Sequence, residues 1–152
     1  MNTRELGRLR RQEIEALIDK HGGSVTPAQV VEYGKNPTTA LHGLFTWDDT
    51  EAAQRWREEQ ATQYLRITVT VLKTDGADPT RVRAFVSLPS DRGENGYRRT
   101  VDVLHDPERR AEMLAHAANE YKQYRNRYKH LEELSAFFAA GDAVFTAELV
   151  AA

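Results

Sequence analysis

The hydrophobic periodicity of this chain changes twice, and these changes limit the folds that it can adopt. Apolar residues recur at helical spacing up to about residue 66, alternate with polar residues in the next segment, and return to helical spacing from about residue 106. A period of about 3.6 is typical of an amphipathic helix, and a period of 2 is typical of a half-buried strand. Helices and strands that are segregated along the chain in this way predict an α+β fold.

The first part of the chain is predicted to be a helical half, formed by residues 1–66. Paired glycines and a Thr-Pro dipeptide mark helix boundaries, because glycine suits a helix C-terminus and proline suits a first helical position. Acidic residues are favoured at a helix N-terminus. The expected helices cover 5–20, 27–33, 37–45, and a stretch that Asp48 or Asp49 caps and that runs to about Arg66.

The segment from 67 to 104 is predicted to form a three-stranded antiparallel meander. Apolar and polar residues alternate over 67–72, and a second alternating run follows over 81–86. The Asn95-Gly96 dipeptide is typical of a tight hairpin turn, so a third strand is expected after it, from Tyr97 to Leu104.

A long C-terminal helix is predicted from Asp106-Pro107 to Gly141. It carries a heptad pattern of apolar residues from Leu114 to Phe138, which either packs on the protein's own sheet or joins two subunits. About 33 helical residues span about 50 Å, whereas strands of about six to eight residues span about 20–27 Å. A homo-oligomer, most simply a dimer, is therefore expected. The predicted interface residues are Tyr124, Tyr128, Leu131 and Phe138.

Composition limits the remaining choices. The 152 residues are assigned to a single domain, made of the helical half 1–66, the β-meander 67–104 and the long helix 105–141. The absence of cysteine excludes disulfides and thiolate chemistry. No apolar run reaches the length of a signal sequence or a membrane span, so a cytoplasmic location is expected. The formal net charge is −2, so nucleic-acid binding would need a local basic patch.

The helices predicted at 27–33 and 37–45 have the lengths of a helix-turn-helix motif. The second helix would present polar side chains to a DNA groove, where Asn and Thr can contact base edges and Lys can contact phosphate. The alternative is that both helices only pack on the core. The predicted DNA contacts of this motif are Lys35, Asn36, Thr38, Thr39 and His42.

Arginines gather on or beside the predicted hairpin. A hairpin that follows a helix-turn-helix is the order of a winged helix, whose wing arginines can follow a phosphate backbone or enter a minor groove. The alternative is that these arginines protect exposed strand edges from pairing with other chains. The residues concerned are Arg81, Arg83, Arg92, Arg98 and Arg99.

No catalytic or metal-binding motif is found in the sequence. His42 could approach Asp48 or Asp49, but its spacing from them matches no recognised metal site, and a capping role already explains the acidic residues. No phosphate-binding loop or nucleophile motif occurs. We therefore expect neither enzymatic activity nor a cofactor or metal. Trp47 and Trp56 are expected to pack in the core rather than to stack on bases.

The stretch from Asn36 to Arg66 carries the most specific motif of the chain: Leu41-His42, Phe45, Trp47-Asp48-Asp49, Ala52-Ala53 and Arg57. This order resembles that of small proteins encoded by bacteriophages and prophages. The chain departs from the family pattern at Thr38-Thr39-Ala40, where the family has Ser-Pro before Leu-His. The resemblance implies a phage or prophage origin and the cytoplasm of a host cell, and it implies no mechanism.

The function expected from these patterns is that of a phage-type DNA-binding protein, acting as a regulator or as an accessory factor in DNA metabolism. The arginine-rich hairpin and the helix pair favour this interpretation. The alternative is a non-enzymatic interaction protein that binds a host or phage protein through the 114–138 seam. The near-neutral charge and the aromatic residues of the seam favour this second interpretation.

Overall fold

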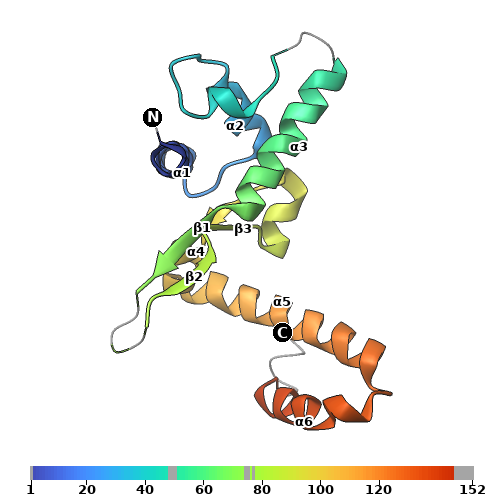
Figure 1. Cartoon of the computed structure of the whole chain (residues 1–152). Coiled ribbons are helices and arrows are strands. Elements are labelled where there is room, and N and C mark those ends of the chain that lie inside the picture. The colour runs from blue at the N-terminus through green and yellow to red at the C-terminus, as the bar shows by residue number, and fades with distance from the viewer. Residues whose placement is uncertain (1, 48–50, 74–75, 77, 146–152) are drawn as a thin grey trace. The chain divides into compact units, whose positions relative to one another are not determined.

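The computed structural model describes residues 2–47, 51–73, 76 and 78–145, without the side chains of residues 51 and 52. Helices and short antiparallel strands occur together, which confirms the α+β class (Figure 1). The chain forms two compact units, Met1–Val103 and Leu104–Ala152. The assignment of all residues to a single domain stays a prediction.

Three α-helices form most of the first unit: α1 (Thr3–Lys20), α2 (Pro27–Gly34) and α3 (Glu51–Ile67). They confirm the helices predicted at 5–20, at 27–33 and up to about residue 66, whereas the predicted caps of the last helix, Asp48 or Asp49, lie outside the described residues. The predicted cap of α2 is also confirmed, because the Thr26 hydroxyl accepts a hydrogen bond from the Gln29 backbone N–H at 3.2 Å. The helices enclose a core whose fully buried side chains include Ile14, Ile18, Val30, Val31, Leu41, Leu65 and Phe85.

The helix predicted over 37–45 is wrong, because this segment contains only one 3-10 turn, η1 (His42–Leu44). The side-chain oxygen of Asn36 accepts hydrogen bonds from the backbone N–H and the hydroxyl of Thr38, at 3.0 and 2.8 Å. Such local side-chain bonds compete with helix formation. The recognition helix of the predicted helix-turn-helix is therefore absent from this segment.

Three residues of the Leu41–Arg57 motif, His42, Trp47 and Arg57, fix this loop against α3. The ring of His42 stacks on Trp47 with centroids 5.0 Å apart, and the Arg57 guanidinium lies 5.2 Å from the Trp47 ring centroid. The backbone carbonyl of Gly34 lies 2.8 Å from Nδ1 of His42. A Cβ at Gly34 would lie 2.8 Å from the ring of the buried Phe45, so the close approach requires glycine. The motif thus has a structural role in this chain.

The predicted three-stranded meander is wrong, because the strands form two separate two-stranded sheets. In the first sheet, β1 (Val69–Leu72) pairs antiparallel with β2 (Thr80–Arg83). In the second sheet, β3 (Phe85–Val86) pairs antiparallel with β4 (Arg98–Arg99). Figure 1 shows the β1–β2 hairpin extending from the C-terminal end of α3.

The third strand is shorter than predicted because the chain before and after it is helical. Residues Pro89–Glu94 form the 3-10 helix η2, and α4 (Thr100–His105) follows β4 directly. Asn95 adopts a left-handed conformation, with φ 54° and ψ 35°, as the C-cap of η2. The Asn95-Gly96 signal therefore marks the end of a 3-10 helix instead of a two-residue hairpin turn.

A buried ion pair between Asp91 and Arg98 holds η2 against β4. Nε of Arg98 lies 2.9 Å from each carboxylate oxygen of Asp91, and Nη2 lies 2.7 Å from Oδ1. The two side chains are 6% (Asp91) and 18% (Arg98) exposed. Nη1 of Arg98 also donates to the backbone carbonyl of Gly23 at 3.3 Å, which connects β4 to the loop between α1 and α2.

Two further contacts hold β4 and the residue before it against α1 and the loop that follows α1. The backbones of Val25 and Tyr97 exchange hydrogen bonds of 2.9 and 2.8 Å. The Arg99 guanidinium binds the carboxylates of Asp19 and Asp102. The strand therefore has a fixed position relative to the first helix.

The second unit is a helical hairpin. It consists of α5 (Pro107–Tyr128), the 3-10 turn η3 (Glu132–Leu134) and α6 (Ser135–Val144). Asp106 caps α5 as predicted, and the backbone N–H of Arg109 holds the pKa of its carboxyl below the usual range. The continuous helix predicted up to Gly141 is wrong, because the chain turns after Tyr128 and α6 runs back along α5.

Contacts between the two helices explain this reversal. The Tyr121 hydroxyl donates to the backbone carbonyl of Phe138 at 2.8 Å, and Arg125 binds Asp142 with Nη2 2.9 Å from Oδ2. Phe138 is only 6% exposed. Gly141 lies inside α6, where a Cβ would overlap the Tyr121 ring. One straight helix would leave these partners far apart.

We predict that Asp91→Asn lowers the free energy of unfolding by about 3 kcal/mol, because it leaves the largely buried Arg98 guanidinium without a counter-charge. Urea unfolding followed by circular dichroism measures the change. The control is Asp102→Asn, which removes one partner of the more exposed Arg99 pair and should stay within about 1 kcal/mol of the original chain. Equal stability of the two variants would contradict a special role for the buried pair.

We predict that Gly141→Ala destabilises the helical hairpin by about 1–3 kcal/mol, because the new methyl group displaces the Tyr121 ring from its hydrogen bonds. Hydrogen exchange should accelerate at the amides of α6. Gly7→Ala is the matched control, since a Cβ at Gly7 in α1 meets nothing within 4 Å. That variant should gain about 0.5–1 kcal/mol. If the hydrogen-exchange rates of the α6 amides stayed the same in Gly141→Ala, the close approach of Gly141 to Tyr121 would not be needed for stability.

Candidate nucleic-acid interface

A basic cleft lies between α1 and the β1–β2 hairpin in the first unit. It has a volume of about 480 Å³, and no acidic side chain of the described residues lines it. Opposite charges in a shaped concavity attract each other more strongly than on a flat surface, because the low-dielectric walls focus the field. We call this feature the arginine cleft, after the residues Arg4, Arg8, Arg11 and Arg81 that line it.

Three of these arginines come from a single face of α1. Arg4, Arg8 and Arg11 follow i, i+4, i+7 spacing, which places their side chains in one stripe along a helix. Arg11 also anchors the helix to the hairpin, because its Nη1 lies 3.5 Å from the carbonyl oxygen of Val69. Its Nε lies 3.7 Å from Glu15, so its charge is partly compensated within the chain. The local periodicity of α1 thus presents a row of cations to the cleft.

The opposite wall of the cleft includes Val69 of β1 and Arg81 of β2. Val69 lies across from Arg83, and Val71 lies across from Arg81. Residues that are paired directly across two antiparallel strands project on the same side. We call these four residues the hairpin face. Val69 and Val71 are 41% and 50% exposed.

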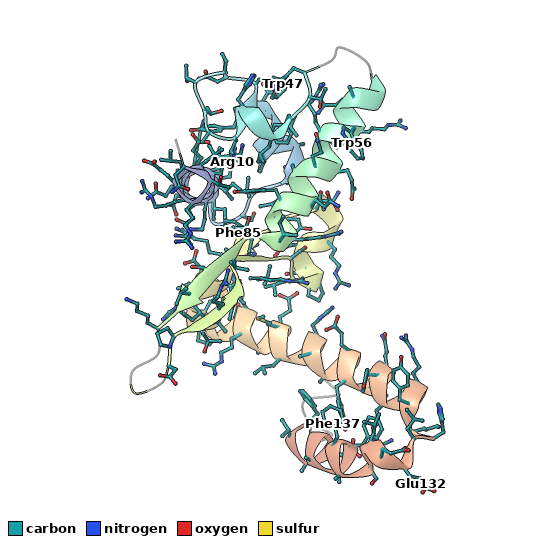
Figure 2. All side chains as sticks on the ribbon, in the orientation of Figure 1. Arg10, Trp47, Trp56, Phe85, Glu132 and Phe137 are labelled. Atoms are coloured by element: carbon teal, nitrogen blue, oxygen red, sulfur yellow. The ribbon has the colours of Figure 1, made fainter. Side chains whose placement is uncertain are left out.

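Tyr64 adds a polar group to the cleft. Its partial burial raises the pKa of the phenol, although the nearby charges of Arg10 and Arg11 oppose the shift. The hydroxyl therefore stays protonated at neutral pH and can donate a hydrogen bond to an anionic oxygen. Arg10 itself is bound elsewhere, since its Nε donates to the carbonyl of Ala40 at 3.0 Å (Figure 2).

The arginines predicted near the hairpin fall into two groups. Arg81 lines the cleft, and Arg83 lies beside it on the hairpin face. Arg98 and Arg99 are engaged in the ion pairs that hold β4, so their charges are already balanced within the chain. Arg92 is exposed on η2 and does not line the cleft.

The residues of the predicted helix-turn-helix do not line the arginine cleft. The Lys35 ammonium lies 2.6 Å from a Glu32 carboxylate oxygen. Asn36, Thr38 and Thr39 bind one another in the turn that replaces the second helix, and His42 stacks on Trp47. Figure 2 shows Trp47 beside the loop that precedes α3, whereas the hairpin follows the other end of that helix.

Sequence reasoning missed the three arginines of α1. Their spacing can be read from the sequence, but arginines on a helix usually only form its solvent-exposed face. Only the position of the hairpin beside α1 turns them into one wall of a cleft. The prediction that Trp56 packs in the core is wrong, because this side chain is 57% exposed on α3, whereas Trp47 packs against the core as predicted.

Other kinds of site are less well supported. Within the described ranges, no group of three or more His, Asp or Glu side chains could hold a metal ion. A second cavity, of about 280 Å³, is lined by Glu58, Glu59 and Glu94 together with Arg55 and neutral residues. Its mixed charge does not favour an anionic ligand. No helix in the described part of the chain combines the length and the apolar character needed to cross a membrane.

Comparisons of the chain with models of protein families, with curated proteins and with solved structures find no match. The resemblance to phage-encoded proteins therefore stays a prediction.

Proposed function

We propose that the protein binds DNA through the arginine cleft and acts as a regulator or accessory factor in phage or prophage DNA metabolism. The observation that carries this proposal is the convergence of four arginines from two separate elements in a cavity without an acidic lining residue. The chain as a whole has a formal net charge of −2. A local concentration of positive charge in such a chain favours a polyanionic ligand.

The spacing of the α1 arginines suits a phosphate backbone. The seven residue steps from Arg4 to Arg11 rise about 10 Å along the helix axis. Phosphates of one DNA strand repeat about every 3.4 Å along the duplex axis, so about three of them fall within this length. Arginine guanidinium groups bind phosphate oxygens through two parallel hydrogen bonds. The neutral phenol of Tyr64 supplies a further donor at the same surface.

The phage setting rests on the resemblance alone. The described side chains of the motif that carries it pack the loop before α3, and none of them lines the arginine cleft. The proposal of DNA binding therefore depends on the cleft and does not depend on the resemblance to phage-encoded proteins. The two parts of the proposal can be tested separately.

We predict salt-dependent binding of duplex DNA, with a slope of log K against log salt of about −4 if four phosphates are neutralised. Fluorescence polarisation with a labelled duplex at several salt concentrations measures it. The double variant Arg4→Ala, Arg8→Ala should lower the magnitude of the slope by about 2, because two contacts are lost. Both side chains lie on the surface of α1, so the fold should persist.

Two control variants locate the effect. Arg55→Ala removes an exposed arginine of α3 that lines the second cavity, and Lys35→Ala tests the surface expected from the helix-turn-helix interpretation. Neither should change the slope. Absence of salt-dependent binding at micromolar protein, or an equal effect of Arg55→Ala, would refute the proposal.

A second candidate function is protein interaction through the helical hairpin of the second unit. Tyr124 is 43% exposed, and Phe137, which Figure 2 labels, is 53% exposed. Their ring centroids lie 6.1 Å apart. Leu131 is 39% exposed at the turn between the helices. Of the predicted interface residues, Phe138 is buried inside the hairpin and is unavailable to another chain, whereas Tyr128 is partly exposed. Exposed aromatic clusters of this kind favour a protein partner, and the partner proposed is a second copy.

For this candidate we predict a dimer, with a mass about twice the 17.3 kDa of the chain, in light scattering at micromolar concentration. Phe137→Glu should convert it to a monomer, because the charge would be buried in the interface. Trp56→Glu, at an equally exposed aromatic position of the first unit, is the control and should leave the mass unchanged. A monomeric original chain would exclude the dimer.

A further inference from the structure

The hairpin face combines exposed apolar side chains with exposed cationic side chains. Two exposed valines stand directly across the strands from two exposed arginines, in the register Val69 to Arg83 and Val71 to Arg81. With the described residues, neither Arg81 nor Arg83 forms a side-chain hydrogen bond or ion pair. A ligand for this face must therefore offer anionic or acceptor groups and small apolar groups at the same spacing.

The edge of duplex DNA in its major groove has this chemistry. Guanine presents two acceptors that bind one arginine guanidinium in a bidentate manner, and thymine presents a methyl group that packs against an apolar side chain. Phosphates line both rims of the groove. The arginine stripe of α1 shares the cleft with Val69 and Arg81, so it can bind one rim while the hairpin face contacts bases.

The dimensions of the hairpin also fit this groove. Two paired strands lie about 4.8 Å apart, so a ribbon with its side chains fits a groove about 12 Å wide and exceeds one about 6 Å wide. Each strand has four residues and therefore spans about 13 Å. At about 3.4 Å per base pair, this length covers about four base pairs. Arg81 and Arg83 are two residues apart, about 6.6 Å, which corresponds to about two base pairs.

We infer that the β1–β2 hairpin is a base-reading ribbon that enters the major groove of duplex DNA, with Arg81 and Arg83 on two guanines about two base pairs apart and Val69 and Val71 against neighbouring thymine methyl groups. This inference rests on the proposed DNA-binding function. It adds sequence specificity, which phosphate contacts alone do not provide. Arg81 and Arg83 are specificity residues, and the α1 arginines are positioning residues.

Single-stranded nucleic acid is the less favoured ligand for this face. Proteins that hold single strands without sequence preference stack bases on aromatic side chains. The hairpin face has none, because its four members are two valines and two arginines. Tyr64 lies at the base of the cleft and is partly buried. A duplex is therefore the ligand to test first.

The first experiment selects binding sites from a random duplex pool with the full chain and then measures the selected and scrambled duplexes by fluorescence polarisation. We expect enrichment of two guanines about two base pairs apart. Arg81→Lys keeps the charge but replaces the planar guanidinium fork, which matches O6 and N7 of guanine, with a flexible ammonium group, so the affinity ratio of selected to scrambled duplex should fall about tenfold. Affinity for scrambled duplex and the salt slope should not change. Arg8→Lys is the matched control and should keep the ratio.

A chemical change in the DNA gives an independent readout. Replacing the selected guanines by 7-deazaguanine removes the N7 acceptor and should weaken binding by the original chain about tenfold. Binding by Arg81→Lys should change much less, because that contact is already lost. Thermal unfolding of Arg81→Lys should match the original chain, since the side chain is exposed.

Several results would overturn the inference and leave the proposed function intact. The first is that the selection enriches no sequence. The second is that the affinity ratio of selected to scrambled duplex is unchanged in Arg81→Lys, and the third is that single-stranded DNA competes as well as duplex. Each of these counts against the inference alone when salt-dependent binding that needs Arg4 and Arg8 is still observed. Absence of any binding at low salt would instead overturn both.

Discussion

The buried pair of Asp91 and Arg98 is the contact on which the geometry of the first unit depends most. It fixes β4 against the 3-10 helix η2, and Arg98 also binds the carbonyl of Gly23 beyond α1. Because β4 pairs with β3, and β3 follows directly from β2, the position of the hairpin is set through this strand. The arginine cleft exists only while α1 and the hairpin face each other. A structural ion pair outside the cleft therefore controls the shape of the proposed binding surface.

Arginine has two distinct roles in this chain. Arg57, Arg98 and Arg99 are used within the fold, where ring stacking, carbonyl groups or carboxylates compensate their charge. The arginines of the cleft are bound less completely and are available to a ligand, with Arg11 as the intermediate case. The two groups are alike in the sequence. Their separation explains how a chain with a formal net charge of −2 can present a basic surface.

The second unit shows how an apolar repeat can be satisfied within one chain. The heptad pattern suggested one helix with a seam for a partner, but α6 folds back and buries Phe138 against Tyr121 of α5. The absence of a side chain at Gly141 permits this approach. What remains exposed is a smaller aromatic surface around Tyr124 and Phe137. The hairpin buries apolar area within one chain, whereas a single straight helix would need a second molecule to bury it. This burial stabilises the hairpin.

The sequence by itself determined the α+β class, the positions of α1, α2 and α3, and the caps at Thr26 and Asp106, because these depend on neighbouring residues and on a repeat of apolar positions. Only the tertiary structure decided the rest. Local hydrogen bonds of Asn36 and Thr38 replaced a predicted helix, and the strands paired as two sheets. The cleft also lay beyond the sequence, because its walls are brought together by contacts between residues about 60 or more positions apart, such as Arg11 with Val69 and Asp19 with Arg99. Side chains so distant in the chain have no spacing that a local pattern can reveal.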